Sequence, residues 1–191
     1  MIAGIIASIL AAGGGPTDTG WVASQSIVDQ GDVFEAWSNL ANAEDNGAGN
    51  QPTGTFATNA VGDGSYTNTI YCTDFAFAVP SGATIDGIEI RQRLKSAGSN
   101  DVIRTTAYVL LNSVESGTGA YDNGSISGTV TDYDSGGASS LLGTSPTAGD
   151  GTASTDVNNS GFGVALQYLE DDEGGSTVSL DAVFIKVHYT T

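Results

Sequence analysis

Three observations predict an all-β fold, a sandwich or barrel of strands, for this chain of 191 residues. Glycine is abundant, with 27 residues, and Ser, Thr, Asn and Asp fill much of the remainder, which favours strands joined by tight turns. Apolar residues occur in short, separate runs that alternate with polar residues. Turn-rich loops divide these runs, and no alternation of strands with helices indicates a parallel sheet.

The clearest strand is residues 88–95, IEIRQRLK. Ile88, Ile90 and Leu94 fall on one face, because side chains alternate along a strand. The opposite face carries Glu89, Arg91, Arg93 and Lys95. The pattern predicts a half-buried strand with a wet, mostly basic outer face.

Three further runs predict strands at residues 102–111, 162–169 and 181–189. The first is expected to be the more fully buried kind. Their inward faces are expected to carry Ile103, Ala107, Val109 and Leu111 in the first, Phe162, Val164, Leu166 and Tyr168 in the second, and Val183, Ile185, Val187 and Tyr189 in the third.

The charge balance excludes two classes of partner. The chain has 22 acidic and five basic residues, a formal net charge of -17. A nucleic-acid backbone requires several cations aimed at phosphates, and an anionic membrane surface would repel the protein. We therefore expect no nucleic-acid partner and no membrane partner. Cys72 is the only cysteine, so an intrachain disulfide or a paired-cysteine metal site is impossible.

The sequence assigns no catalytic residue and no cofactor. His188 is the only histidine, and its strand pattern explains it as a surface or edge residue. A triad would need Asp, His and Ser together, and no G-x-S-x-G motif marks a nucleophile. We predict a protein that is not an enzyme. A hydrolase acting on cell-surface polysaccharide is the third hypothesis, behind two binding or structural functions given below.

Acidic and aromatic side chains in turns are the remaining candidate ligands. Residues 170–173, EDDE, and the segment DYDSGG with Asp132 and Asp134 suggest a Ca²⁺ or Mg²⁺ site, since hard cations take carboxylate oxygens. DYDSGG resembles the start of an EF-hand loop but lacks the later ligands, so we assign no metal and expect solvated loops. The aromatic candidates for stacking on sugar, also expected to pack over sheet ends, are Tyr66, Tyr71, Tyr121 and Tyr133.

Residues 75–91, FAFAVPSGATIDGIEIR, form the most informative stretch. Phe75 and Phe77 are expected to share one face of a strand. Pro80 and Gly82 predict a turn. Gly87 is expected to let the next strand bend, or to let another backbone approach closely.

This stretch resembles a group of small β-sandwich proteins encoded among the structural genes of tailed bacteriophages. Further elements of that family pattern follow in the same order over residues 35–191. They are Trp37-Ser-Asn39-Leu-Ala-Asn42-Ala43, Gly64-Ser65-Tyr66, Pro80 to Ile88, Gly136-Gly137-Ala138-Ser139, Leu142-Gly143, Phe162-Gly163-Val164 and Val187-His188-Tyr189-Thr190. The resemblance implies a jelly-roll-like antiparallel sandwich and a structural role in the virion, and it implies no catalytic residue.

The first segment, MIAGIIASILAAGGGP, is apolar and carries no charged side chain. Ile2, Ile5, Ile6 and Ile9 follow the spacing of one helix face, with Ala3, Ala7 and Ala11 beside them. The run is too short for a transmembrane helix, and it lacks the basic residues of a secretory signal. It predicts a helical anchor that contacts a partner through Ile2, Ile5, Ile6, Ile9 and Leu10, with the glycines as a hinge.

These inferences divide the chain into an anchor (1–15), a linker or arm (16–34) and a β-sandwich domain (35–191). The leading hypothesis is a bacteriophage virion protein at the particle surface, decorating or cementing the capsid. Its expected partners are the major capsid protein or another virion protein, and copies of itself in a homotrimer. The alternative is a tail or head fibre module that binds host surface glycans.

Overall fold

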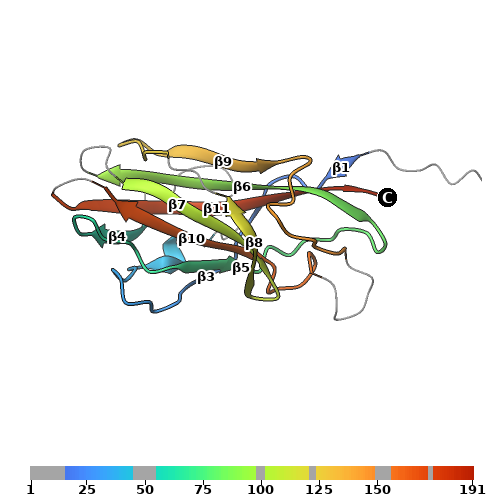
Figure 1. The fold of residues 1–191 in the computed structure, drawn as a ribbon, viewed down its shortest axis with the longest axis horizontal. Helices are drawn as coiled ribbons and strands as arrows, with labels where there is room; N and C mark the ends of the chain where they lie inside the picture. The colour runs from blue at the N-terminus through green and yellow to red at the C-terminus, as the bar shows by residue number, and fades with distance from the viewer. Residues whose placement is uncertain (1–15, 45–54, 98–101, 121–123, 149–155, 172–173) are drawn as a thin grey trace, which may run out of the picture.

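A computed structural model describes residues 16–44, 55–97, 102–120, 124–148, 156–171 and 174–191. These residues form eleven strands in two antiparallel sheets that pack face to face (Figure 1). The strands are β1 (Thr17–Asp18), β2 (Val22–Ala23), β3 (Ser26–Asp29), β4 (Ala57–Val61), β5 (Ile70–Thr73), β6 (Thr84–Ala97), β7 (Val102–Leu111), β8 (Val114–Ala120), β9 (Thr131–Gly137), β10 (Gly163–Glu170) and β11 (Ser176–Thr190). A single 3-10 turn, η1 (Leu40–Asn42), accompanies them in the described part of the chain.

The strand pairing is that of a jelly roll. In sheet A, β11 lies between β6 and the short strands β1, β2 and β4, and β9 forms the other edge; sheet B has the order β3-β5-β10-β7-β8. Strand β4 pairs with β11, β5 with β10, β6 with β9, and β7 with β8. This nested pairing of first with last strands, divided over two sheets, is the double Greek key of jelly-roll domains. The predicted all-β, jelly-roll-like sandwich is confirmed.

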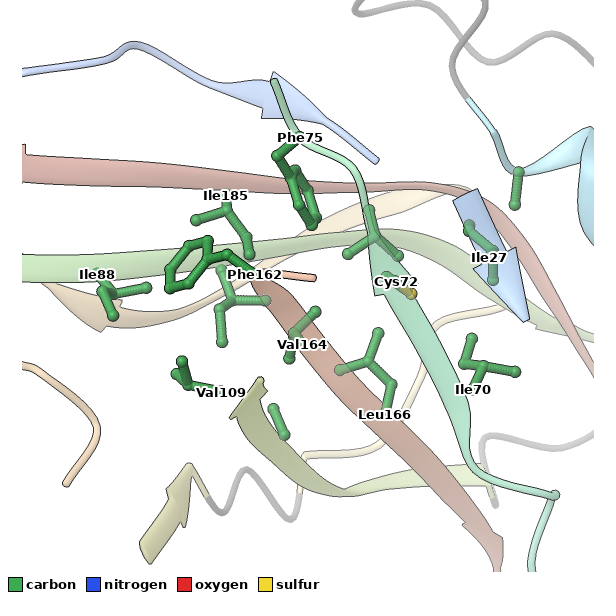
Figure 2. Packing of buried hydrophobic residues seen from close by; sticks show 14 of the residues in the cluster. Ile27, Ile70, Cys72, Phe75, Ile88, Val109, Phe162, Val164, Leu166 and Ile185 are labelled. Atoms are coloured by element: carbon green, nitrogen blue, oxygen red, sulfur yellow. The ribbon is translucent and has the colours of Figure 1, made fainter. Parts of the chain in front are cut away.

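The core lies between the sheets and follows the predicted alternation. Figure 2 shows Cys72, Val164 and Leu166 of sheet B pointing into the same apolar space as Ile88 and Ile185 of sheet A. The inward faces predicted for residues 88–95, 162–169 and 181–189 are confirmed: Phe162, Val164, Leu166 and Tyr168, for example, are all at most 1% exposed.

Strand β7 departs from simple alternation. Gln167 pairs with Thr106, but Tyr168 pairs with Arg104, so a bulge shifts the register of β7 against β10. A bulge turns the side chains on one side of it to the opposite face. Val102 is therefore buried together with Ala107 and Val109. Strict alternation along the strand would have put Val102 on the opposite face from the other two residues. The side chain of Ile103, predicted to point inward, lies outside the described part of the structure.

The strand predicted at Phe75 and Phe77 is wrong, although both rings are buried. Asp74 and Ala76 have φ angles of 59° and 51°, which interrupt an extended backbone. The two rings stack with centroids 5.8 Å apart, and Phe77 also contacts the edge of Phe162. The predicted turn follows, since the amide of Ala83 donates to the carbonyl of Pro80.

Gly87 lies where two backbones meet, as predicted. A Cβ at this position would lie 2.3 Å from the carbonyl oxygen of Gly137 and 2.4 Å from the carbonyl carbon of Ala138. The backbone at the end of β9 thus approaches β6 so closely that only glycine, which has no Cβ, fits at position 87.

Residues 16–29 add strands to both sheets. Thr17 of β1 pairs with Tyr189 near the end of β11, and Val22 of β2 pairs with Ile185. Strand β3 then pairs with β5 in sheet B.

The predicted helical anchor, with Ile2, Ile5, Ile6, Ile9 and Leu10, lies outside the described residues. In the part of the chain that is described, no helix has the length and apolarity of a membrane span.

Candidate functional site

The outer face of sheet A holds the basic strand that the sequence predicted. Arg91 donates from Nε and Nη2 to the carboxylate of Asp134, both at 2.7 Å. Arg93 donates to Asp132 at 2.7 and 3.0 Å in the same two-pronged manner. These bonds raise the pKa values of both guanidinium groups, and the bond from Arg93 lowers the pKa of Asp132. The two aspartates considered as cation ligands are thus engaged by the protein's own cations.

Aromatic rings cover the rest of this basic row. The Trp21 ring lies 4.2 Å from the guanidinium of Arg91 and 4.6 Å from the ammonium of Lys186. Phe184 lies under Arg93, and Phe56 lies under Lys95. Lys186 also forms an ion pair with Glu89 at 3.1 Å. The outer face of sheet A is therefore a layer of paired charges and rings that fastens β2, β6, β9 and β11 together.

The outer face of sheet B has a different character. Ala165 of β10 pairs with Tyr71 of β5 on one side and with Tyr108 of β7 on the other. The three residues alternate with the core residues Cys72, Val164 and Val109, so they face outward. A row of tyrosine, alanine and tyrosine thus crosses the middle of the sheet.

A hollow of about 190 Å³ lies beside this row. It is lined by Thr69, Tyr108, Glu115, Ala165, Leu166 and Gln167. The Tyr71 hydroxyl donates to Oε1 of Glu115 at 3.1 Å, a bond that joins β5 to β8 across β10 and β7. Partial burial and the Glu115 carboxylate raise the pKa of Tyr71, and Asp32 contributes in the same direction.

The other tyrosines considered for sugar stacking do not reach this hollow, as far as they are described. Tyr66 packs against Phe34, with ring centroids 5.5 Å apart. Tyr133 lies in β9 rather than in a loop, with its ring 3.9 Å from the guanidinium carbon of the buried Arg104. Tyr121 lies outside the described residues. Of the four candidates, Tyr71 alone is connected to the sheet B hollow, since it does not line the hollow but its hydroxyl donates to Glu115, which does.

Sequence analysis missed Tyr108, Glu115 and Gln167. Tyr108 and Gln167 fall between inward residues of their strands, so alternation alone could have placed them outward. Nothing in one sequence says that β5, β10 and β7 are neighbours. The chain brings these side chains together only through the nested pairing.

The remaining chemical candidates occupy structural positions. His188 interacts through Nε2 with Glu89 on the outer face of sheet A. Glu170 ends β10 and is buried, whereas Asp171 is exposed and the next two acids lie outside the described residues. Among the described residues, no group of three or more His, Cys, Asp and Glu side chains could hold a metal ion. Cys72 is fully buried in the core, and burial raises the pKa of its thiol.

Comparison with known proteins gives no family and two distant structures. The sequence matches no family model and no curated relative. A chain described as "CBM4 structure and function" is 15% identical, with coverage of 87% of this chain and 93% of that chain and a TM-score of 0.36. The N-terminal cellulose-binding domain of Cellulomonas fimi β-1,4-glucanase C is 14% identical, with coverage of 90% and 86% and a TM-score of 0.31. The strand pairing of the present chain defines its fold independently of both.

Proposed function

We propose that the chain is a non-enzymatic structural protein of a bacteriophage particle that decorates the capsid exterior. The proposal starts from the ordered set of sequence elements over residues 35–191 that resembles small sandwich proteins of tailed phages. Jelly rolls build viral capsid domains as well as lectin domains, so the fold is compatible with this role. Fold alone does not determine function, so the contacts among the elements of the set matter as well.

The observation that carries the proposal is that elements far apart in the sequence contact one another in the fold. Trp37, of the first element, is fixed to the core beside the set, where its indole N–H donates to the backbone carbonyl of Asn68 and its ring packs edge-on against Tyr168, with ring centroids 5.8 Å apart. Phe77 contacts Phe162 at the same centroid distance. Gly87 meets the backbone of Gly137. Two pairs of elements of the set therefore pack against each other, so the residues that carry the resemblance are constrained together by one fold.

The anchor would join the sandwich at one tip. Pro16 is exposed, and β1 pairs with the last residues of β11 beside the C-terminus (Figure 1). A segment attached there can engage the major capsid protein or another virion protein without disturbing the core. In this proposal the apolar row Ile2, Ile5, Ile6, Ile9 and Leu10 makes that contact, and the acidic sandwich, as a homotrimer, faces solvent.

Immunogold labelling of intact virions with antibody to residues 35–191 tests the location. Gold distributed over the head supports capsid decoration. Gold confined to the tail or its tip overturns decoration and favours the fibre module.

A substitution pair tests the anchor. Replacing Ile2, Ile5, Ile6, Ile9 and Leu10 by serine should abolish incorporation into particles while circular dichroism shows an unchanged sandwich. Replacing Ala3, Ala7 and Ala11 by serine is the matched control and should leave most incorporation intact. Equal incorporation of both variants would contradict the proposed anchor.

A further inference from the structure

The outer face of sheet B has the form of a shallow binding site. Tyr71 and Tyr108 stand two strands apart, on either side of β10, which places their Cα atoms roughly 9–10 Å from each other. Ala165 lies between them and is only 1% exposed, although it faces outward. Neighbouring side chains therefore cover this alanine, so the accessible lining of the hollow is formed by Thr69, Tyr108, Glu115 and Gln167.

Polar groups line the hollow beside the ring of Tyr108. Glu115 brings a carboxylate from the edge strand β8 and already accepts the bond from Tyr71. Gln167, two residues along β10 from Ala165, brings a carboxamide whose Nε2 donates to the carbonyl of Thr67 at 3.1 Å. Thr69 brings a hydroxyl to the same lining. A few convergent polar groups beside aromatic surface are the usual composition of a small-molecule site.

The size of the hollow indicates that it contacts only one or two residues of a chain-like ligand. A hollow of about 190 Å³ is smaller than the roughly 300–1,000 Å³ pockets that enclose drug-sized molecules. The hollow is also open to solvent along the sheet, since Tyr71, Tyr108 and Gln167 are half-buried. Such a surface suits one or two units of a longer chain.

The negative charge around the hollow disfavours anionic ligands. Glu115 and Asp32 both act on the Tyr71 phenol as nearby negative charges, and the whole chain carries a formal charge of -17. The five basic residues are elsewhere: Arg91, Arg93, Lys95 and Lys186 lie on the outer face of sheet A, and Arg104 is buried. An anionic ligand would meet repulsion at the hollow.

From these observations we infer that the hollow on the outer face of sheet B, lined by Tyr108, Glu115 and Gln167, binds a neutral glycan. The apolar C–H face of a sugar ring packs on tyrosine, and its hydroxyl groups can both donate to Glu115 and bond with the Gln167 carboxamide and the Thr69 hydroxyl. The site lies on sheet B and needs no residue of the segment 1–15. It is therefore a function in addition to particle decoration, and the two can fail separately.

Isothermal titration calorimetry on the full chain tests the inference, with cellohexaose, maltohexaose, xylohexaose and galactohexaose as neutral probes and sialyllactose as the anionic probe. We expect at least one neutral probe to bind, with a dissociation constant in the range of about 10 μM to 1 mM. Binding to none of the neutral probes, or to sialyllactose alone, would overturn the inference.

Variants locate the binding. Tyr108→Ala and Glu115→Gln should each weaken binding at least about tenfold, while the matched control Tyr66→Ala, at the separate contact with Phe34, should leave the dissociation constant within about twofold. Glu115→Gln keeps the shape of an exposed side chain, so it remains informative if Tyr108→Ala fails to fold. Binding that is insensitive to Glu115→Gln and to any folded Tyr108 variant places the ligand elsewhere and contradicts the proposed site.

Discussion

The phenol of Tyr168 on β10 donates a hydrogen bond of 2.8 Å to the side-chain carbonyl of Gln92 on β6, and this bond joins the two sheets through the core. Both side chains are almost fully buried, at 1% and 3% exposure. Gln92 lies among the inward residues of β6, between Ile90 and Leu94, where alternation calls for an apolar side chain. Its burial is tolerated because the tyrosine satisfies its oxygen.

Removing only the donor should therefore be costly. Tyr168→Phe leaves the buried Gln92 oxygen without this bond and is expected to lower the free energy of unfolding by about 1–3 kcal/mol. Adding Gln92→Leu should recover much of that loss, because an apolar pair no longer carries the desolvated carbonyl. Urea unfolding of the two variants measures both effects. A double variant less stable than Tyr168→Phe would show that the bond is not the reason Gln92 is buried there.

The close backbone approach at Gly87 of β6 predicts that an added methyl group destabilises the fold there, and Gly137 of the paired strand β9 provides the control. Gly87→Ala would place a methyl group against backbone atoms of Gly137 and Ala138, which cannot rotate away, and should cost about 1–3 kcal/mol of stability. Gly137→Ala meets no atom within 4 Å and should change stability by no more than about 0.5 kcal/mol. Thermal unfolding followed by circular dichroism compares the two. Similar melting temperatures would contradict the close approach.

Local pattern was sufficient to predict the strands that carry most of the core. The period of two is unbroken from Ile88 to Leu94 in β6 and from Val183 to Val187 in β11, so Ile88, Ile90, Val183 and Ile185 could be placed without a structure. The turn at Pro80 and Gly82 was also predictable, because its residue types restrict the backbone.

Pattern failed where the backbone departs from strand geometry for reasons that lie elsewhere in the fold. The bulge in β7 is a shift of its pairing register with β10. The left-handed backbone at Asp74 and Ala76 occurs where Phe75 and Phe77 are both buried in the core. The hollow on sheet B has the same origin, since Tyr71, Tyr108 and Glu115 meet only after three loops have closed. Residues that are neighbours by pairing, and not by sequence, leave no periodic signal.

The Arg93–Asp132 pair predicts a defined dependence of stability on pH. The hydrogen bond from Arg93 lowers the pKa of Asp132 below its ordinary value of 3.8. A carboxyl group whose pKa is lower in the folded state stabilises the fold above its unfolded pKa, and that contribution disappears as the pH falls through the folded value. The difference in unfolding free energy between the native chain and Asp132→Asn should thus be constant above about pH 5 and shrink below about pH 4.

A second background separates this pair from general acid destabilisation. With Arg93→Met in both chains, the difference in unfolding free energy between the chain that keeps Asp132 and the chain with Asp132→Asn should lose most of its dependence on pH in the same window, because the main cause of the pKa shift is gone. Urea titrations at pH 7, 4 and 3 measure the four chains. An unchanged pH profile in the Arg93→Met background would assign the effect to other charges.

The thiol of Cys72 reports on opening of the whole sandwich. Cys72 is fully buried between Ile27 of β3 and Val164 of β10, which pair with it on either side, and burial raises the pKa of its thiol. Since the thiolate is the reactive form, a disulfide reagent at pH 8 should not label the folded chain during the time in which it labels the urea-unfolded chain completely. Labelling in low urea should follow the unfolding equilibrium.

The Ser81→Cys substitution in a Cys72→Ala background supplies the control for reagent access. Position 81 is exposed in the Pro80 turn, so a thiol there should react at once in the folded chain. Rapid labelling of the native chain at Cys72 would mean that β3 and β5 separate without global unfolding, and that sheet B opens at its β3 edge.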